Sequence, residues 1–273
     1  MCANLIRLLV ASLCLPLLMH SARAATPCAD SKGQVLPQGK LLIVGELHGS
    51  QEIPAYVGRL LCAYAEQKLP VILHVEFPES HQEAFNAFMN EADEAKAEKL
   101  VLETDKWSKW MADGSTSRAM LDLFKLARKL RQSGTQVLLN AFTSTTGLPP
   151  PLTPGLAFVQ HYSEAAKAAN VEMRMAQYPD YRHLVLVGES HAEKYAARPW
   201  LPMAYRLSRL LPVRTLGFTF DAADAWVCRG PKDKIICGAT AIGPRKISPL
   251  EFDEVVHIPK LSASPPAVAR KPE

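Results

Sequence analysis

The sequence contains one short motif twice, and each copy places a glutamate and a histidine at the end of an apolar run. Leu41–His48 reads LLIVGELH and Leu184–His191 reads LVLVGESH, so each run ends in Gly-Glu-x-His. An apolar run of this length that is bounded by glycine is typical of a buried strand in a parallel sheet. In open α/β sheets, ligands bind beyond the carboxyl ends of such strands. The sequence therefore predicts one site that gathers four side chains: Glu46, His48, Glu189 and His191.

A third apolar run, Val71–Glu76, adds two candidates. His74 and Glu76 share one face of this expected strand, because side chains alternate along it. If this strand lies beside the first one, Glu76 joins Glu46 and His48 at the same edge. Carboxylates and imidazoles ligate divalent cations such as zinc or manganese, and a neutral imidazole is a general base near pH 7.

The expected functional set, Glu46, His48, Glu76 and His191, admits two hydrolytic mechanisms. A zinc, manganese or iron ion held by these four side chains would lower the pKa of a bound water to ~7. Without a metal, a histidine would deprotonate the water directly while a glutamate orients it. Plainer roles also stay open, since Glu46 or Glu189 would suit a helix N-terminus and His74 would suit a hydrogen-bonded core position.

The segment Asp113–Arg118, DGSTSR, is a candidate for binding the substrate. Its glycine and hydroxyl residues suit a helix N-terminus, where free N–H groups and Arg118 would hold an anionic group. Asp113 and Arg118 are thus expected substrate-binding residues, together with Glu189 and His74. A capping motif with no catalytic role is the other interpretation. The sequence lacks the motifs of serine hydrolases, zincins and P-loop proteins.

The elements that must position these residues alternate along the chain. Apolar periodicity predicts strands over residues 41–45, 71–76, 137–141, 184–188 and 213–220, and helices over 53–67, 79–103, from 115 or 117 to 131, 156–177 and 202–210. This alternation predicts an α/β fold with a mainly parallel central sheet flanked by helices. Residues 226–238 are expected to add a C-terminal β-hairpin, and the proline-rich residues 144–155 a loop that forms a lid or rim of the site.

The first 24 residues have the pattern of a secretory signal peptide. Arg7 supplies the positive charge, an apolar core follows, and Ala22–Ala24 forms a small-x-small cleavage site. We expect cleavage after Ala24 and, in a bacterium, a periplasmic or secreted protein. Residues 25–260 are expected to form a single domain, and residues 261–273, rich in proline and alanine, a disordered tail. No later apolar run approaches the ~18–20 residues of a membrane span.

The charge balance bears on the class of partner. Loss of the signal removes Arg7 and Arg23 and no acidic residue, which lowers the formal net charge from +4 to +2. The remaining basic residues are scattered, so there is no electrostatic reason to expect a nucleic acid. We expect a small-molecule or peptide substrate, and the sequence sets no oligomeric state.

Four cysteines follow the signal, and an even number in an exported chain favours disulfides. Cys228 and Cys237 flank the turn of the expected hairpin and could face each other. Cys28 paired with Cys62 would then join the mature N-terminus to the first helix. Other pairings are also compatible with the sequence. Zinc binding is not favoured, because the cysteines have neither close CxxC spacing nor a neighbouring histidine.

The doubled Gly-Glu-x-His, the strand-end Glu76 before a proline and the segment Trp107–Met120 resemble a known superfamily. It joins erythromycin esterases, ChaN-like haem-binding proteins and Tiki proteases, and the segment is similar to that of its uncharacterised exported bacterial members. The resemblance spans about residues 40–220. It implies an α/β core in which the paired motifs converge on one cleft, with Glu46, His48, Glu76 and His191 as the functional residues. Glu189 departs from the pattern, in which asparagine or another residue often stands at that position.

The resemblance does not choose between functions, because its members include esterases, metal-dependent proteases and haem binders. The first hypothesis is an exported hydrolase of an ester or amide bond, with or without a divalent metal. The alternative is a haem- or iron-binding protein of an uptake system, which would use a tyrosine or histidine as axial ligand. Three tyrosines are available for that role: Tyr56, Tyr64 and Tyr162. A scaffold without catalytic activity is the third reading.

Overall fold

The structure is a computed structural model that describes residues 28, 34–108, 114–144, 156–195, 199–230 and 235–268. Its centre is a six-stranded sheet in the order β3-β2-β4-β1-β5-β8, and every neighbouring pair of strands is parallel. The strands are β1 (Leu41–Glu46), β2 (Val71–Pro78), β3 (Val137–Thr143), β4 (Arg182–Gly188), β5 (Val213–Thr219) and β8 (Glu254–His257). The predicted α/β fold with a parallel sheet is confirmed.

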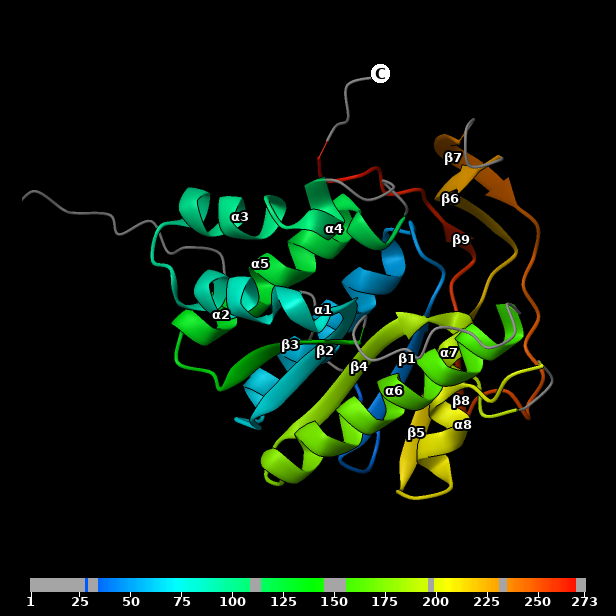
Figure 1. Cartoon of the computed structure of the whole chain (residues 1–273), viewed down its shortest axis with the longest axis horizontal. Helices are drawn as coiled ribbons and strands as arrows, with labels where there is room; N and C mark the ends of the chain where they lie inside the picture. Colours follow the sequence, from blue (N-terminus) through cyan, green and yellow to red (C-terminus); the bar gives the residue numbers. More distant parts are fainter. Residues whose placement is uncertain are drawn as a thin grey trace, which may run out of the picture.

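Helices cover both faces of this sheet (Figure 1). One face carries α1 (Glu52–Glu66), α2 (Gln82–Asn90) and α5 (Arg118–Gln132), and α3 (Glu94–Leu102) and α4 (Asp105–Ser108) lie farther out beside them. The other face carries α6 (Leu156–Gln177), α7 (Glu189–Ala192) and α8 (Met203–Ser208). Short 3-10 turns at Glu79–His81 and Gly114–Thr116 complete the helical elements of the described part of the chain.

Coverage on both faces explains why the strands are continuously apolar. Leu42 and Val44 of β1 point into the core beneath α1 and α5, whereas Leu41 and Ile43 point into the core beneath α6 and α8. Every residue of β1 is therefore buried, and the same holds for β4 after its first residue. A strand that is buried on both faces needs apolar residues at every position rather than at alternate ones.

The sequence analysis considered β1 and β2 as neighbouring strands, and in the structure they are not neighbours. The structure places β4 between them, paired in parallel with both. From β1 the chain runs to β2 and then to β3, and the connecting helices lie on one face of the sheet. It then runs back through α6 to β4 and on to β5, and these connections lie on the other face. Because right-handed crossovers in opposite directions use opposite faces, β1 and β4 flank the point at which the direction reverses. Ligand sites of open α/β sheets lie at such a point.

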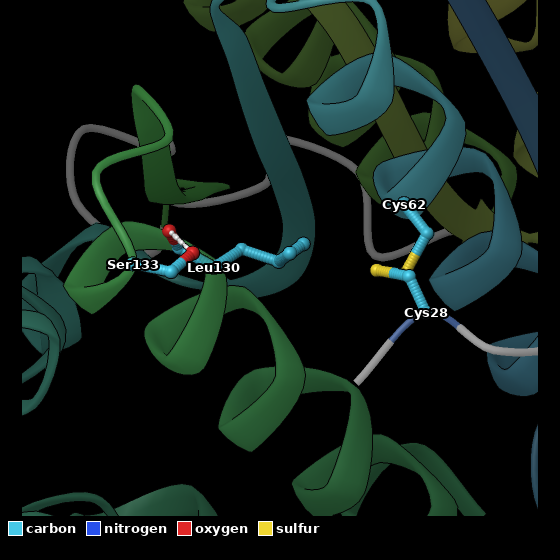
Figure 2. The surroundings of a disulfide bond; sticks show 4 residues. All are labelled: Cys28, Cys62, Leu130 and Ser133. Carbon is cyan, nitrogen blue, oxygen red and sulfur yellow. Dashed lines mark hydrogen bonds between the residues drawn. A yellow bond between two sulfur atoms is a disulfide. The ribbon is translucent and has the colours of Figure 1, made fainter. Parts of the chain in front are cut away.

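A second, smaller sheet follows the central one, in the order β7-β6-β9. It contains β6 (Ala222–Arg229), β7 (Ile236–Ile242) and β9 (Lys260–Leu261), and β6 and β7 form the antiparallel hairpin that the sequence predicts. Cys228 and Cys237 are directly paired across this hairpin and form a disulfide. Cys28 and Cys62 form the second disulfide, which ties the chain before β1 to α1 (Figure 2). Two disulfides are typical of proteins from oxidising compartments.

The expected disordered tail is wrong over residues 261–268. Ser264 is buried; its N–H donates to the carbonyl of Gly49, and its hydroxyl accepts from the N–H of Ala119. Ala267 N–H donates to the carbonyl of Thr116. The composition of the segment misled the prediction, because backbone hydrogen bonds to the main body, rather than a hydrophobic run, hold it in place.

The predicted signal peptide, residues 1–24, lies outside the described residues. Most of the expected lid, residues 145–155, also lies outside them. Within the described parts, no helix combines the length and apolarity that a bilayer crossing requires.

Candidate functional site

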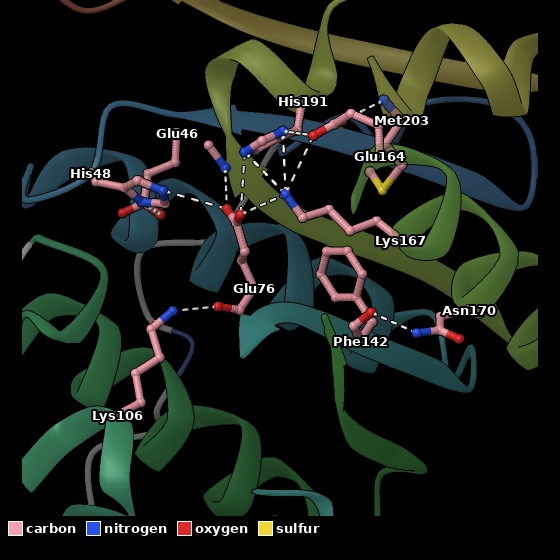
Figure 3. A network of polar contacts seen from close by, with 11 residues as sticks. Glu46, His48, Glu76, Lys106, Phe142, Glu164, Lys167, Asn170, His191 and Met203 are labelled. Carbon is pink, nitrogen blue, oxygen red and sulfur yellow. Dashed lines mark hydrogen bonds and ion pairs between the residues drawn. The ribbon is translucent and has the colours of Figure 1, made fainter. Parts of the chain in front are cut away.

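Three neighbouring strands end at one cluster of charged side chains. Glu46 is the last residue of β1, and His48 follows it by two positions. Glu76 lies near the end of β2, and His191 lies in α7, which begins directly after β4. Because β4 lies between β1 and β2, His191 enters from the middle and the other three side chains from either side (Figure 3). The structure thus brings together all four residues of the expected functional set.

Glu76 is the centre of this cluster. Its Oε1 lies 3.0 Å from Lys167 Nζ and 3.2 Å from His191 Nε2. Its Oε2 accepts the backbone N–H of Gly188 at 2.9 Å and lies 3.4 Å from His48 Nε2. One carboxylate therefore contacts both motif histidines, and each of its oxygens faces a different pair of donors.

Each histidine has a second carboxylate behind it. His48 Nδ1 donates to Glu46 Oε2 at 3.0 Å, and His191 Nδ1 donates to Glu164 Oε1 at 2.5 Å. Both imidazoles are therefore held between two glutamates, with Glu76 shared between them. Such pairing fixes the orientation of the rings and stabilises their charged form.

Glu164 and Lys167 of α6 were missed by the sequence analysis. The Glu164 side chain is fully buried, and its Oε2 accepts the N–H of Met203 at 2.8 Å. Lys167 Nζ lies 3.0 Å from Glu76 Oε1 and 3.5 Å from Glu164 Oε1. It is also nearly equidistant from the two ring nitrogens of His191, at 3.1 and 3.3 Å. The sequence did contain a signal: positions 164, 167 and 168, and 171 follow the spacing of a buried helical stripe.

The pKa shifts of this cluster follow from its pairing. Burial opposes the ionised form of Glu76, but Lys167 and His191 outweigh it and hold the pKa of that carboxyl well below its usual range. Burial also opposes the charged form of His48, but Glu46 and Glu76 outweigh it and raise the pKa of that imidazole to about 10. The pKa of His191 is raised as well, against burial, chiefly by Glu76 and Glu164. At neutral pH the His48 imidazole is therefore protonated, and the same pairing favours the protonated form of His191.

The cluster is exposed unevenly. The side chains of Glu46 and Lys167 are 1% and 6% exposed, whereas that of His48 is 35% exposed. A substrate would therefore meet His48 first. Glu46 Oε1 is buried and takes no hydrogen bond from any described residue, so it is open to a donor such as a buried water molecule.

Glycines make room for the His48 turn. A Cβ on Gly188 would lie 2.9 Å from His48 Nε2, so a side chain at this position would enter the cluster. Gly49 has φ +79°, and a Cβ there would lie 2.3 Å from the carbonyl oxygen of Trp226. A Cβ on Gly114 would lie 2.1 Å from the backbone nitrogen of Gly49. Gly114 of the DGSTSR segment therefore packs directly against the turn that follows His48.

The arrangement does not fit a bound divalent metal. Across the described ranges, no three or more His, Cys, Asp and Glu side chains form a group that could hold a metal ion. The donors have partners instead, since both ring nitrogens of His191 face carboxylates and the Lys167 ammonium lies beside Glu76 Oε1. A cation at this point would be repelled by that ammonium. The expected metal role of Glu46, His48, Glu76 and His191 is therefore not supported, and no step below involves a metal.

Two further residues of the sequence analysis lie outside the cluster. Glu189 begins α7 but turns to Arg245, whose Nε donates to its Oε1 at 2.9 Å. His74 is fully buried lower in the sheet, where its Nε2 lies 3.0 Å from His183 Nδ1 and its Nδ1 accepts from Asn140 at 3.0 Å. His74 does lie on the same face of β2 as Glu76, as the alternation of side chains predicts. It is two residues farther from the carboxyl end of the strand, however, and so lies outside the cluster.

Arg118 also lies away from the cluster. Ser117 caps α5 by accepting the N–H of Met120, and Arg118 lines a separate cavity of about 380 Å³ between α1 and α5. Its backbone N–H donates to the carbonyl of Pro265, so the C-terminal segment covers this helix N-terminus. The Ser117 cap agrees with the capping interpretation of the segment, and substrate binding by Arg118 stays a prediction. Asp113 lies outside the described residues.

The tyrosines considered as haem ligands do not share a site. Tyr64 is buried in the core, and the ring of Tyr56 packs edge to face on Phe218. Tyr162 is 38% exposed on α6. None of these three positions singles out an axial ligand.

Comparisons with known proteins bear on the fold. No protein-family model matches the sequence, and no curated protein matches it. A protein from Bacillus cereus is 10% identical, with a TM-score of 0.62 over 84% of this chain and 91% of that chain. A succinoglycan biosynthesis protein is 11% identical, with a TM-score of 0.59 over 83% and 89% of the two chains. An erythromycin esterase mutant, EreC in its open conformation, is 11% identical, with a TM-score of 0.56 over 82% and 79%. The chain therefore has the fold of the erythromycin esterase that the resemblance predicts.

Proposed function

We propose that the protein is an exported hydrolase that cleaves an ester or amide bond by proton transfer within the glutamate–histidine cluster, without a metal. The single observation that carries this proposal is the position of Glu76, whose carboxylate lies 3.4 Å from His48 and 3.2 Å from His191. A carboxylate shared by two imidazoles, at the carboxyl ends of β1, β2 and β4, is a proton-transfer unit at the edge where ligands bind.

The roles follow from the charges and the exposure. His48 is the most exposed of the four predicted residues and carries a proton at neutral pH, so we assign it as the general acid that protonates the leaving group. Glu76 is ionised, and its Oε2 faces His48, so it accepts a proton from the attacking water. This revises the sequence-based choice of a histidine as base, because a protonated imidazole has no free lone pair.

The remaining residues support these two. Glu46 holds His48 by its Nδ1 and opposes loss of the imidazolium proton. His191 contacts Glu76 Oε1 and leaves Oε2 to the His48 side. Export is supported by the two disulfides and by the signal-like residues 1–24.

The experiment is a panel of chromogenic esters and anilides assayed with the purified mature chain and with Glu76→Gln. We expect hydrolysis of at least one substrate class and a loss of about 100-fold or more in kcat/KM in the variant. Glu103→Gln is the control, because Glu103 is exposed directly after the end of α3, and this variant should retain full activity. A folded Glu76→Gln protein with wild-type activity would overturn the proposed role of the cluster.

A further inference from the structure

Lys167 is the buried cation of the cluster. Its side chain is 6% exposed, and it reaches the site from α6 rather than from either Gly-Glu-x-His motif. Burying a lysine is costly unless the charge is paired, and here two carboxylates pair with it. The nearer one is Glu76, at 3.0 Å, and the farther one is Glu164, at 3.5 Å.

The contact selects one oxygen of Glu76. Lys167 and His191 Nε2 both face Oε1, at 3.0 and 3.2 Å. Oε2 faces the backbone N–H of Gly188 and His48 Nε2. Because both oxygens of the Glu76 carboxylate have donors, its plane is fixed and rotation about the Cγ–Cδ bond is opposed. Only Oε2 is then directed toward the partly exposed His48.

We propose that Lys167 is a positioning residue of the hydrolase, which keeps Glu76 ionised and keeps its Oε2 directed toward His48. The inference rests on the proposed function for its catalytic meaning and on geometry for the contact itself. Lys167 does not meet the substrate in this role, since it lies on the buried side of Glu76.

Other charged groups face Glu76 and set the background against which Lys167 acts. His48 and His191 contact its carboxylate, and Lys106 Nζ of α4 donates to its backbone carbonyl. Glu46 and Glu164 lie one contact farther away, where Glu46 pairs with His48 and Glu164 pairs with His191 and Lys167. Lys167 is the nearest of the three basic side chains that contact the Glu76 carboxylate, at 3.0 Å against 3.2 Å for His191 and 3.4 Å for His48. It therefore extends the ionised state of Glu76 to a lower pH than the two imidazoles alone would allow.

The test is a pair of titrations with Lys167→Met and, as a matched control, Lys125→Met. Lys125 also pairs with two glutamates, Glu94 and Glu98, but on the surface of α5. The carboxyl carbons of 13C-labelled glutamates are followed by NMR, with the Glu76 signal assigned by its loss in Glu76→Gln. We expect the Glu76 midpoint to rise by about 1–3 pH units in Lys167→Met and to stay unchanged in Lys125→Met.

The kinetic arm uses the same proteins on the best ester. The acid limb of the kcat profile should move to higher pH by the same interval, with a loss of about fivefold or more at the wild-type midpoint and near-full recovery above the new one. An equal loss at every pH, with an unmoved Glu76 signal, would overturn the proposal and leave Lys167 a structural residue. If Lys167→Met does not fold, Lys167→Gln, which keeps a donor without the charge, gives the same comparison. Absence of any hydrolysis would contradict the proposed function alone, because the NMR arm still measures the Lys167 contact.

Discussion

Gly188 and His48 lie so close that a single methyl group at Gly188 would touch the imidazole. The distance from an ideal Cβ at Gly188 to His48 Nε2 is 2.9 Å, and the same Cβ would lie 3.5 Å from Glu76 Oε2. Glycine at the end of β4 is therefore what lets the His48–Glu76 contact form.

We expect Gly188→Ala to reduce kcat by about 100-fold, because His48 must move away from Glu76 and a displacement of about 1 Å is enough for such a loss. Steady-state kinetics and thermal unfolding of the variant measure this. Gly243→Ala is the matched control, since a Cβ there meets no atom within 4 Å. Equal activity of the two variants would contradict the account of this contact.

The proposed role of His48 as general acid predicts an upper pH limit for activity. Glu46 and Glu76 raise the pKa of His48 to about 10 against the effect of burial, so activity should persist through neutral pH and fall as the pH rises through about 10. A general base at this position would give the opposite limb, with a rate that rises over that range. A kcat profile from pH 6 to 11, checked for irreversible unfolding at each pH, separates the two.

The same shift has a consequence for stability. A histidine whose pKa is raised in the folded state stabilises the fold fully below its unfolded value of about 6.5 and loses that contribution as the pH rises through about 10. Chemical unfolding between pH 6 and 10 should show this decline in the wild type. The free energy of unfolding should decline less with pH in His48→Gln. An identical pH dependence in both proteins would contradict this contribution of His48.

The buried pair His74 and His183 predicts the reverse behaviour in acid. Burial lowers the pKa of both imidazoles, and His183 also sits 3.0 Å from His74 and donates from its Nε2 to the carbonyl of Tyr178. Both are therefore neutral in the fold, and stability should fall as the pH drops below about 6.5, where the unfolded chain takes up protons. The free energy of unfolding of His183→Gln and of the wild type, measured at pH 5 and 7.5, gives the contribution of this pair to the loss of stability in acid. A variant that is as acid-sensitive as the wild type would contradict the assignment.

The two disulfides should contribute unequally. They join residues 34 and 9 positions apart, and the chain-entropy relation then gives about 4 kcal/mol for Cys28–Cys62 and about 3 kcal/mol for Cys228–Cys237. Urea unfolding of Cys28→Ser/Cys62→Ser and Cys228→Ser/Cys237→Ser, each with both partners replaced, tests the order. A larger loss from the hairpin pair would show that strain or residual structure dominates instead.

Metal removal should have no effect. Lys167 pairs with Glu76 where a cation would bind, so dialysis against a chelator should leave both kcat and the unfolding temperature unchanged. A loss of activity that one specific divalent ion restores would contradict the metal-free mechanism.

The apolar runs of β1 and β4 and the Gly-Glu-x-His that follows each were enough to predict the parallel sheet and the meeting of His48, Glu76 and His191. This prediction is possible because the carboxyl ends of parallel strands lie at one edge of the sheet, whichever order the strands take. The order itself was not predicted: nothing local in the sequence says that β4 lies between β1 and β2.

Glu164 and Lys167 escaped prediction for a different reason. A glutamate and a lysine three positions apart on a helix usually form a solvated pair, and only the buried neighbours Ala168 and Val171 show that this stripe faces the sheet. The residues of the C-terminal segment, such as Ser264, were misjudged because composition does not report backbone hydrogen bonds to a distant turn.

The catalytic role of His48 is tested by kcat/KM for the best ester substrate, measured in wild type, His48→Gln and His257→Gln. His257 is an exposed histidine in β8, paired with Asp221, and serves as the control. We expect a loss of about 100-fold or more for His48→Gln and full activity for His257→Gln. A folded His48→Gln protein that hydrolyses the substrate at the wild-type rate would contradict the assignment of the catalytic site to this cluster.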